Sequence, residues 1–236
     1  MLHRKERTGM ELTLRHEEIG EAIRSLEMYI SMHLGQYDRI NTMYRLYSGK
    51  ANYDKVVAGE KSRELCFKNI RDTLMPDLLG YPLICANRGI FNKNTDPRAR
   101  DAYDVSQVIH YTLAWFRNPE GGHTLSFDSP LFSGRYLHPE GKASRDAEGE
   151  VITLCLCREQ LEIMIEAAEV YLHLQRGEIG HAFAFFTDSQ AIFREAGSLD
   201  EKIMGLVEPE AIDRCSALLD TLKAAQNNDG TEQMKE

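Results

Sequence analysis

The chain of 236 residues contains an internal repeat, and this feature constrains its fold more than any other. Residues 12–37, LTLRHEEIGEAIRSLEMYISMHLGQY, align without gaps with residues 154–179, LCLCREQLEIMIEAAEVYLHLQRGEI, and seven of the 26 positions are identical. Chance pairing of segments with ordinary composition would give roughly one or two identities. We therefore expect a duplicated structural unit. The alternative is that two unrelated amphipathic helices have converged on one pattern.

Each copy predicts a strand followed by two helices. Apolar residues first alternate, as in a half-buried strand, and then take the spacing of one helix face. That face carries Ile19, Ile23, Leu26 and Ile30 in the first copy, and Leu161, Ile165, Ala168 and Leu172 in the second. Gly35 and Gly177 should end these helices, because glycine tolerates the left-handed conformation of a helix terminus. The second helices carry Ile40, Met43, Tyr44 and Tyr47, or Phe183, Phe186 and Ile192.

These patterns predict a mostly helical α+β fold, in which a duplicated strand-helix-helix unit packs a small sheet on its helices. Beyond that unit the two halves diverge in sequence. A strand as short as Leu12–Leu14 needs a pairing partner, so we expect the two copies to pair within the chain around a pseudo-twofold axis. The expected boundaries are a first unit at 10–132, a linker at 133–150, a second, partial unit at 151–225 and a disordered tail at 226–236.

The segment between the copies predicts two further helices. One lies near Glu60–Leu74, and the second opens at Asp96-Pro97, where aspartate caps a helix and proline fits its first turn. The buried stripe of the second helix is expected to contain Val105, Val108, Ile109, Thr112 and Trp115 or Phe116. The alternation from His123 to Asp128 predicts a strand after it.

The corner WFRNPEGGHTLSFD, residues 115–128, has two interpretations. Asn118-Pro119-Glu120-Gly121 fits a type I turn, and His138-Pro139-Glu140-Gly141 repeats the pattern, which favours turn chemistry. Turn chemistry does not require an arginine beside two glycines, whose backbone N–H groups can bind an anionic oxygen. The candidate ligand-binding set is therefore Arg117, Asn118, Glu120, Gly121 and Gly122, with His110 and Arg88 as helpers.

Catalytic and metal-binding signatures are not found in the sequence. The glycine-rich nucleotide loops, the nucleophile elbow and the H-E-x-x-H zinc motif do not occur, so we expect no catalytic residues, no enzyme activity and no cofactor. Glu17, Glu18 and Glu21 fit the first turn of a helix, where acids favour the dipole. Cys155 and Cys157 would share one strand face, but no second pair completes a zinc set, so no metal is expected.

The net charge of −9 is carried entirely by the second part of the chain, because residues 1–150 contain equal numbers of acidic and basic side chains. This balance argues against nucleic acid as a partner. The apolar runs are too short to span a membrane, and the polar start MLHRKERTGM does not resemble a signal peptide, so we expect a cytoplasmic protein. Acidic helices could instead occupy a basic surface of a host protein.

The blocks AYDVSQVI at 102–109 and RNPEGG at 117–122 resemble a family of small phage and prophage proteins over residues 10–132. The second copy lacks these blocks. The layout and the Arg-Asn corner are also similar to the first family of Thoeris anti-defence proteins, which sequester cyclic ADP-ribose-type immune signals without cutting them. This resemblance implies a non-enzymatic phage-type protein of the host cytoplasm that binds a small anionic, nucleotide-like ligand. The alternative is an acidic protein-interaction module that inhibits a host protein, and homo-oligomerisation stays open in both cases.

Overall fold

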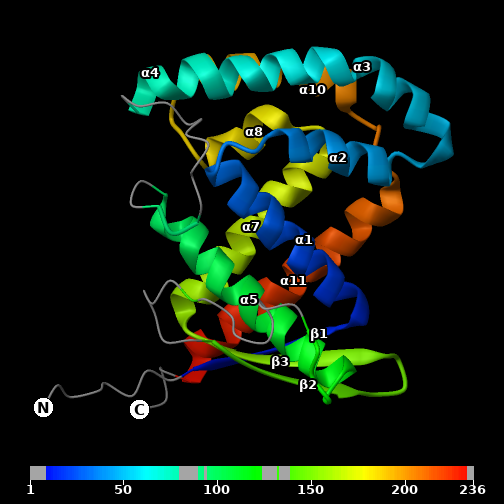
Figure 1. Ribbon diagram of the computed structural model, residues 1–236, viewed down its shortest axis with the longest axis vertical. Coiled ribbons are helices and arrows are strands. Elements are labelled where there is room, and N and C mark those ends of the chain that lie inside the picture. The colour runs from blue at the N-terminus through cyan, green and yellow to red at the C-terminus, as the bar shows by residue number, and fades with distance from the viewer. Residues whose placement is uncertain (1–8, 80–89, 93–94, 124–131, 133–138, 233–236) are drawn as a thin grey trace, which may run out of the picture.

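The computed structural model describes residues 9–79, 90–92, 95–123, 132 and 139–232. Figure 1 shows a helical bundle with a three-stranded antiparallel sheet at one end and α3 across the other. This confirms the mostly helical α+β fold. The strands are β1 (Met10–Arg15), β2 (Glu140–Arg145) and β3 (Glu150–Leu156), in the order β1-β3-β2. The helices are α1 (His16–His33), α2 (Asp38–Tyr47), α3 (Gly49–Asn69), the π-helical η1 (Ile70–Leu74), α4 (Met75–Leu79), α5 (Pro97–Arg117), α7 (Arg158–Arg176), α8 (Ile179–Ala184), α9 (Gln190–Gly197), α10 (Asp200–Ile203) and α11 (Pro209–Glu232).

The two repeats pair through their strands, as predicted. In the antiparallel register of β1 and β3, Leu12 faces Leu154, and these two residues are also equivalent positions of the repeat. Exchanging the copies turns the pair Met10 and Leu156 into the pair Ile152 and Leu14, which is part of the same register. The pairing is therefore consistent with a pseudo-twofold axis that passes between Leu12 and Leu154.

The long helices of the two copies begin and end in the same way. At the start of α1 the backbone N–H of Arg15 donates to Glu18 at 2.8 Å, and at the start of α7 that of Cys157 donates to Gln160 at 2.9 Å. Both pairs occupy equivalent positions of the repeat. Gly35 and Gly177 follow the two helices with φ angles of 72° and 82°, the left-handed conformation predicted for them.

The core lies between α1 and α7, which pack against each other beside the sheet. Leu26 and Leu161 are each 1% exposed, in agreement with the predicted apolar faces. The symmetry also extends further than the sequence identity indicates, because α5 packs on α1 as α11 packs on α7. The bundle is thus built from two sets of strand, long helix and covering helix.

Several expected boundaries are corrected. Residues 140–145 of the expected linker form β2, and Glu150 begins β3, while residues 133–138 lie outside the described part of the chain. Gly141 explains why β2 can lie against α5, since a Cβ atom at this position would be 2.3 Å from Oγ1 of Thr112. Residues 226–232 of the expected tail belong to α11, which continues to Glu232, and residues 233–236 lie outside the described part of the chain.

Other expected elements differ in extent. The helix expected near Glu60 begins at Gly49 as α3, and the second helix of the C-terminal copy is divided into α8 and α9. Trp115 and Phe116 are half-buried, whereas Val105 and Ile109 of the predicted stripe are buried. Of the strand expected at His123–Asp128, only His123 lies within the described residues. In the described part of the chain, no helix combines the length and the apolar character needed to cross a bilayer.

Candidate functional site

A groove of about 600 Å³ lies between α1 and α5 and ends near the sheet. Its orientation follows from the chain order, since α1 begins directly after β1 and α5 ends beside β3. His16 and Arg117 therefore lie at the sheet end of the groove, and Arg24 and His110 lie about two turns further along their helices. The polar lining residues are His16, Glu17, Arg24, Tyr47, His110, Arg117, Glu150 and Arg214.

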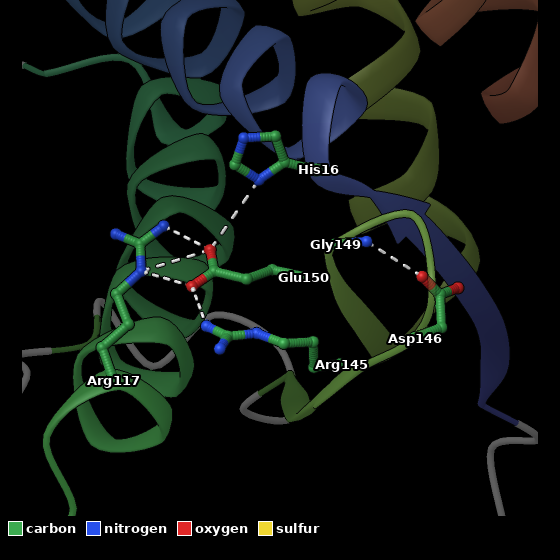
Figure 2. A network of polar contacts seen from close by, with 6 residues as sticks. All are labelled: His16, Arg117, Arg145, Asp146, Gly149 and Glu150. Atoms are coloured by element: carbon green, nitrogen blue, oxygen red, sulfur yellow. Dashed lines mark hydrogen bonds and ion pairs between the residues drawn. The ribbon is translucent and has the colours of Figure 1, made fainter.

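At the sheet end, Glu150 gathers three basic side chains (Figure 2). Nε and Nη2 of Arg117 donate to its carboxylate at 3.0 and 2.6 Å, and Nη2 of Arg145 and Nδ1 of His16 lie 3.7 and 3.9 Å away. The hydrogen bonds from Arg117 hold the pKa of Glu150 below its ordinary range. The carboxylate side chain is 11% exposed and that of Arg117 is 55% exposed, so the carboxylate lies beneath a guanidinium that faces solvent.

A second buried carboxylate lies beneath the other end of the groove. Glu21 is fully buried, and Oε1 accepts hydrogen bonds from Nη2 of Arg24 at 2.7 Å and from Nε of Arg214 at 3.1 Å. The side chains of Arg24 and Arg214 are 40% and 37% exposed. The Arg24 guanidinium also lies over the ring of Tyr47, with Cζ 5.9 Å from the ring centre. The two ends therefore share one arrangement, in which a carboxylate beneath the surface orients the arginines above it.

The stretch between the two ends is mostly apolar, and one of its positions is a glycine, Gly20. Ile19, Ile23 and Leu113 line it, and Ile19 and Leu113 are buried. At Gly20, a Cβ atom would lie 3.1 Å from Nη2 of Arg24, so the guanidinium folds back over the bare helix backbone. Glycine inside a helix costs roughly 1 kcal/mol relative to alanine. The close approach of Arg24 explains why a glycine occupies this helical position.

The structure brings together only part of the ligand-binding set expected from the sequence. Arg117 and His110 line the groove, where Nε2 of His110 lies 3.5 Å from Oε1 of Glu27. The other expected residues of the corner do not line it. The N–H of Gly121 donates to the carbonyl oxygen of Asn118 at 3.2 Å, which closes the predicted turn, and Glu120 is exposed. Gly122 follows with φ 82°, and Arg88 lies outside the described residues.

Sequence reasoning missed most of the groove. The sequence predicts for Glu21 only an acid near the start of a helix, whereas the structure buries it between two arginines. One of these arginines, Arg214, is far from Glu21 in sequence. Glu150, the partner of Arg117, lies at the end of the expected linker. Their distant pairing leaves no local pattern in the sequence. The position of Arg24 four residues after Gly20 is the one short-range signal.

The cysteine pair does not form a metal site. Because β3 ends at Leu156, Cys157 lies at the start of α7 and is buried, whereas Cys155 is exposed on the strand. The expectation that both share a strand face was therefore wrong. In the part of the chain that the structure describes, no group of three or more histidine, cysteine, aspartate or glutamate side chains could hold a metal ion.

No model of a known protein family, no curated protein and no solved structure matches the chain. The resemblance to the phage proteins and to the Thoeris anti-defence family therefore stays a prediction.

Proposed function

We propose that the protein binds a small anionic ligand in the groove between α1 and α5 without chemically transforming it. The observation that supports the proposal is the arrangement of charged side chains, with basic groups at the surface of the groove and acidic groups beneath them. Three arginines face solvent along the groove, while their carboxylate partners, Glu21 and Glu150, are buried or nearly buried beneath them. An approaching ligand therefore meets these guanidinium groups before the two carboxylates beneath them.

The buried carboxylates also prepare the arginines for binding. A guanidinium is planar and has five N–H donors, so it can hold a carboxylate on one edge and bind a second anion with the remaining donors. Arg117 uses Nε and Nη2 toward Glu150, which fixes the plane of the group. A fixed side chain loses less conformational freedom on binding than a free one, and this increases affinity.

The narrower prediction is that the ligand is a nucleotide immune signal sequestered by a phage-type accessory protein. Tyr47 supports a nucleotide because it is an aromatic residue that lines the groove beside Arg24, and aromatic side chains provide contact surface for a base. Its origin in a phage rests on the resemblance alone.

The proposal is tested by isothermal titration calorimetry with cyclic nucleotides, ADP-ribose isomers and simple phosphate esters. We expect saturable binding of at least one phosphate compound, a loss of about tenfold or more in the Arg117→Ala variant, and no change in the ligand itself after incubation. Arg194→Ala is the matched control, because Arg194 is on α9 and does not line the groove. No binding, or equal binding by both variants, would refute the proposal. Turnover of the ligand would replace it with an enzymatic function.

The acidic helices favour a second candidate, an interaction module for a basic host protein. Glu162, Glu166 and Glu169 of α7 line a second groove of about 440 Å³ together with Arg98, Ile165 and Phe185. Exposed charges at the rim of an interface speed association and make it sensitive to salt. A stoichiometric partner that is bound at low salt, released at high salt and lost in the double variant Glu162→Gln/Glu169→Gln would support this candidate. A partner unaffected by that variant would exclude this groove as the binding surface.

A further inference from the structure

The arginines of the α1–α5 groove form two separate clusters rather than one. The first, the sheet-end cluster, consists of Arg117 and Arg145 around Glu150, with His16 beside them. The second, the far cluster, consists of Arg24 and Arg214 around Glu21. Arg24 follows His16 on α1 by eight residues, but its guanidinium folds back to Gly20. Gly20 is four residues from His16, which corresponds to about 6 Å along a helix axis.

The surface between the clusters is mostly apolar. Ile19, Ile23 and Leu113 line it, and Gly20 contributes no side chain. An apolar body placed over the isoleucines would remove their remaining exposed surface from water, which is favourable by roughly 25 cal/mol per Å².

We infer that the groove takes a ligand with two phosphate or carboxylate groups at the ends of an apolar body, one group at each arginine cluster. This inference rests on the proposed function and specifies its ligand class. Two linked anionic groups bind more tightly than one, because the second group binds at a high effective concentration once the first is in place. The gain disappears when the spacer is too short to reach both clusters.

The probes that test the inference are pyrophosphate and linear alkanediol bisphosphates whose lengths bracket a phosphate separation of about 6 Å. Each alkanediol bisphosphate is compared with the alkyl monophosphate of the same length. Calorimetry should show an affinity maximum at the length that spans the clusters, with a gain of about tenfold or more over the monophosphate. Bisphosphates too short to span them should bind like the monophosphate.

Variants at each end separate the two clusters. Arg117→Ala and Arg24→Gln should each reduce the best bisphosphate to the affinity of its monophosphate, and Arg194→Ala should leave the gain unchanged. Glutamine keeps a donor near the buried Glu21, and Arg214 remains as its second partner, so this variant should fold. Circular dichroism and thermal unfolding verify that each variant is folded.

The failure of the inference differs from the failure of the proposed function. If monophosphates bind and depend on Arg117, but no bisphosphate binds more tightly at any length, the groove binds anions and the two-cluster inference is wrong. A gain that persists in Arg24→Gln would also overturn it. If no phosphate compound binds at all, the proposed function fails and the inference fails with it.

Discussion

Arg117 and Glu150 join the two halves of the duplicated chain at the sheet end of the groove. Arg117 ends α5, Glu150 begins β3, and the closest approach of guanidinium and carboxylate is 2.6 Å. The groove is therefore lined by both halves of the chain. Its α1 and α5 residues come from the first half, and Glu150 of β3 and Arg214 of α11 come from the second. Folding of the whole chain is therefore a condition for binding.

Replacing Glu150 by glutamine should lower the free energy of unfolding near pH 7 by no more than about 1 kcal/mol, because solvent screens the half-exposed Arg117. Arg117 holds the pKa of Glu150 in the folded protein below its ordinary value of 4.5. This contribution is therefore present above the ordinary pKa and is lost as the pH falls through the folded-state pKa. Denaturant unfolding near pH 7 and near pH 3 measures it. An undiminished difference between variant and parent at the lower pH would contradict this account.

His33→Gln should remove an acid sensitivity of the fold. His33 is buried near Asp96 and Arg98, between the rings of Tyr29 and Phe186, and burial lowers its pKa from 6.5 to about 4. The unfolded chain takes up a proton first as the pH falls, so the contribution of His33 to stability is complete above 6.5 and is lost as the pH falls toward 4. The loss amounts to up to about 3 kcal/mol.

Glutamine is the matched replacement for His33, because Gln175 occupies the equivalent position of the second copy. Denaturant unfolding of both proteins over the same pH range decides the matter. We expect the parent to lose stability between 6.5 and 4 and the variant to stay nearly constant there. Parallel pH profiles would show that another group titrates.

Gly20→Ala should separate stability from binding. Alanine favours a helix over glycine by up to about 1 kcal/mol, so thermal unfolding should shift upward. The new methyl group would lie 3.1 Å from the Arg24 guanidinium and displace it, so the affinity for the phosphate probes should fall severalfold. Ser62→Ala, on the exposed face of α3, is the control, with a smaller gain in stability and unchanged affinity. Unchanged affinity in Gly20→Ala would show that the placement of Arg24 does not matter.

The pairing of the copies can be tested at adjacent positions of β1. Leu14 is fully buried and faces Ile152, whereas Thr13 is exposed and its Oγ1 lies 3.3 Å from Oγ1 of Thr153. Leu14→Ala should destabilise the fold by about 2–5 kcal/mol through lost contacts and a cavity. Thr13→Ala should cost less than about 1 kcal/mol. Similar costs for the two variants in urea unfolding would be incompatible with this register.

A chain that ends at Glu150 should be insoluble or should self-associate. It would lack nearly all of β3, the middle strand of the sheet, and α7, which covers the apolar face of α1. An exposed apolar face of this size drives association. Sedimentation velocity and thermal unfolding provide the measurement. A monomer with the stability of the full chain would show that the first 150 residues fold as an independent domain.

Local patterns were sufficient for the repeated elements and insufficient for β2. The alternation around Leu12 and Leu154 and the spacing after it predicted strands, helices and their pairing. The segment EGKASR of β2 contains no β-branched or aromatic residue, and its strand depends on pairing with β3 and on the close approach of Gly141 to α5. Such distant requirements leave no periodicity in the segment itself.

The same difference explains the site. Arg117 could be selected because turn chemistry did not require it, but its partner Glu150 lies 33 residues away on another element. The turn at Asn118–Gly121 could be predicted because all the residues that determine it are adjacent in the sequence. The burial of Glu21 could not be predicted, because only the packing against α11 distinguishes Glu21 from the other acids of α1.

The pseudo-twofold arrangement has a consequence for how the molecule can vary. In a symmetric homodimer encoded by a single-copy gene, every substitution appears on both subunits, so equivalent positions always carry the same residue. Here Arg24 in the first copy corresponds to Glu166 in the second, and Gly20 corresponds to Glu162. When the two copies lie in one chain, the residues at equivalent positions can differ. One symmetric scaffold can thereby hold two grooves with different charged residues, because a substitution in one copy leaves the other copy unchanged.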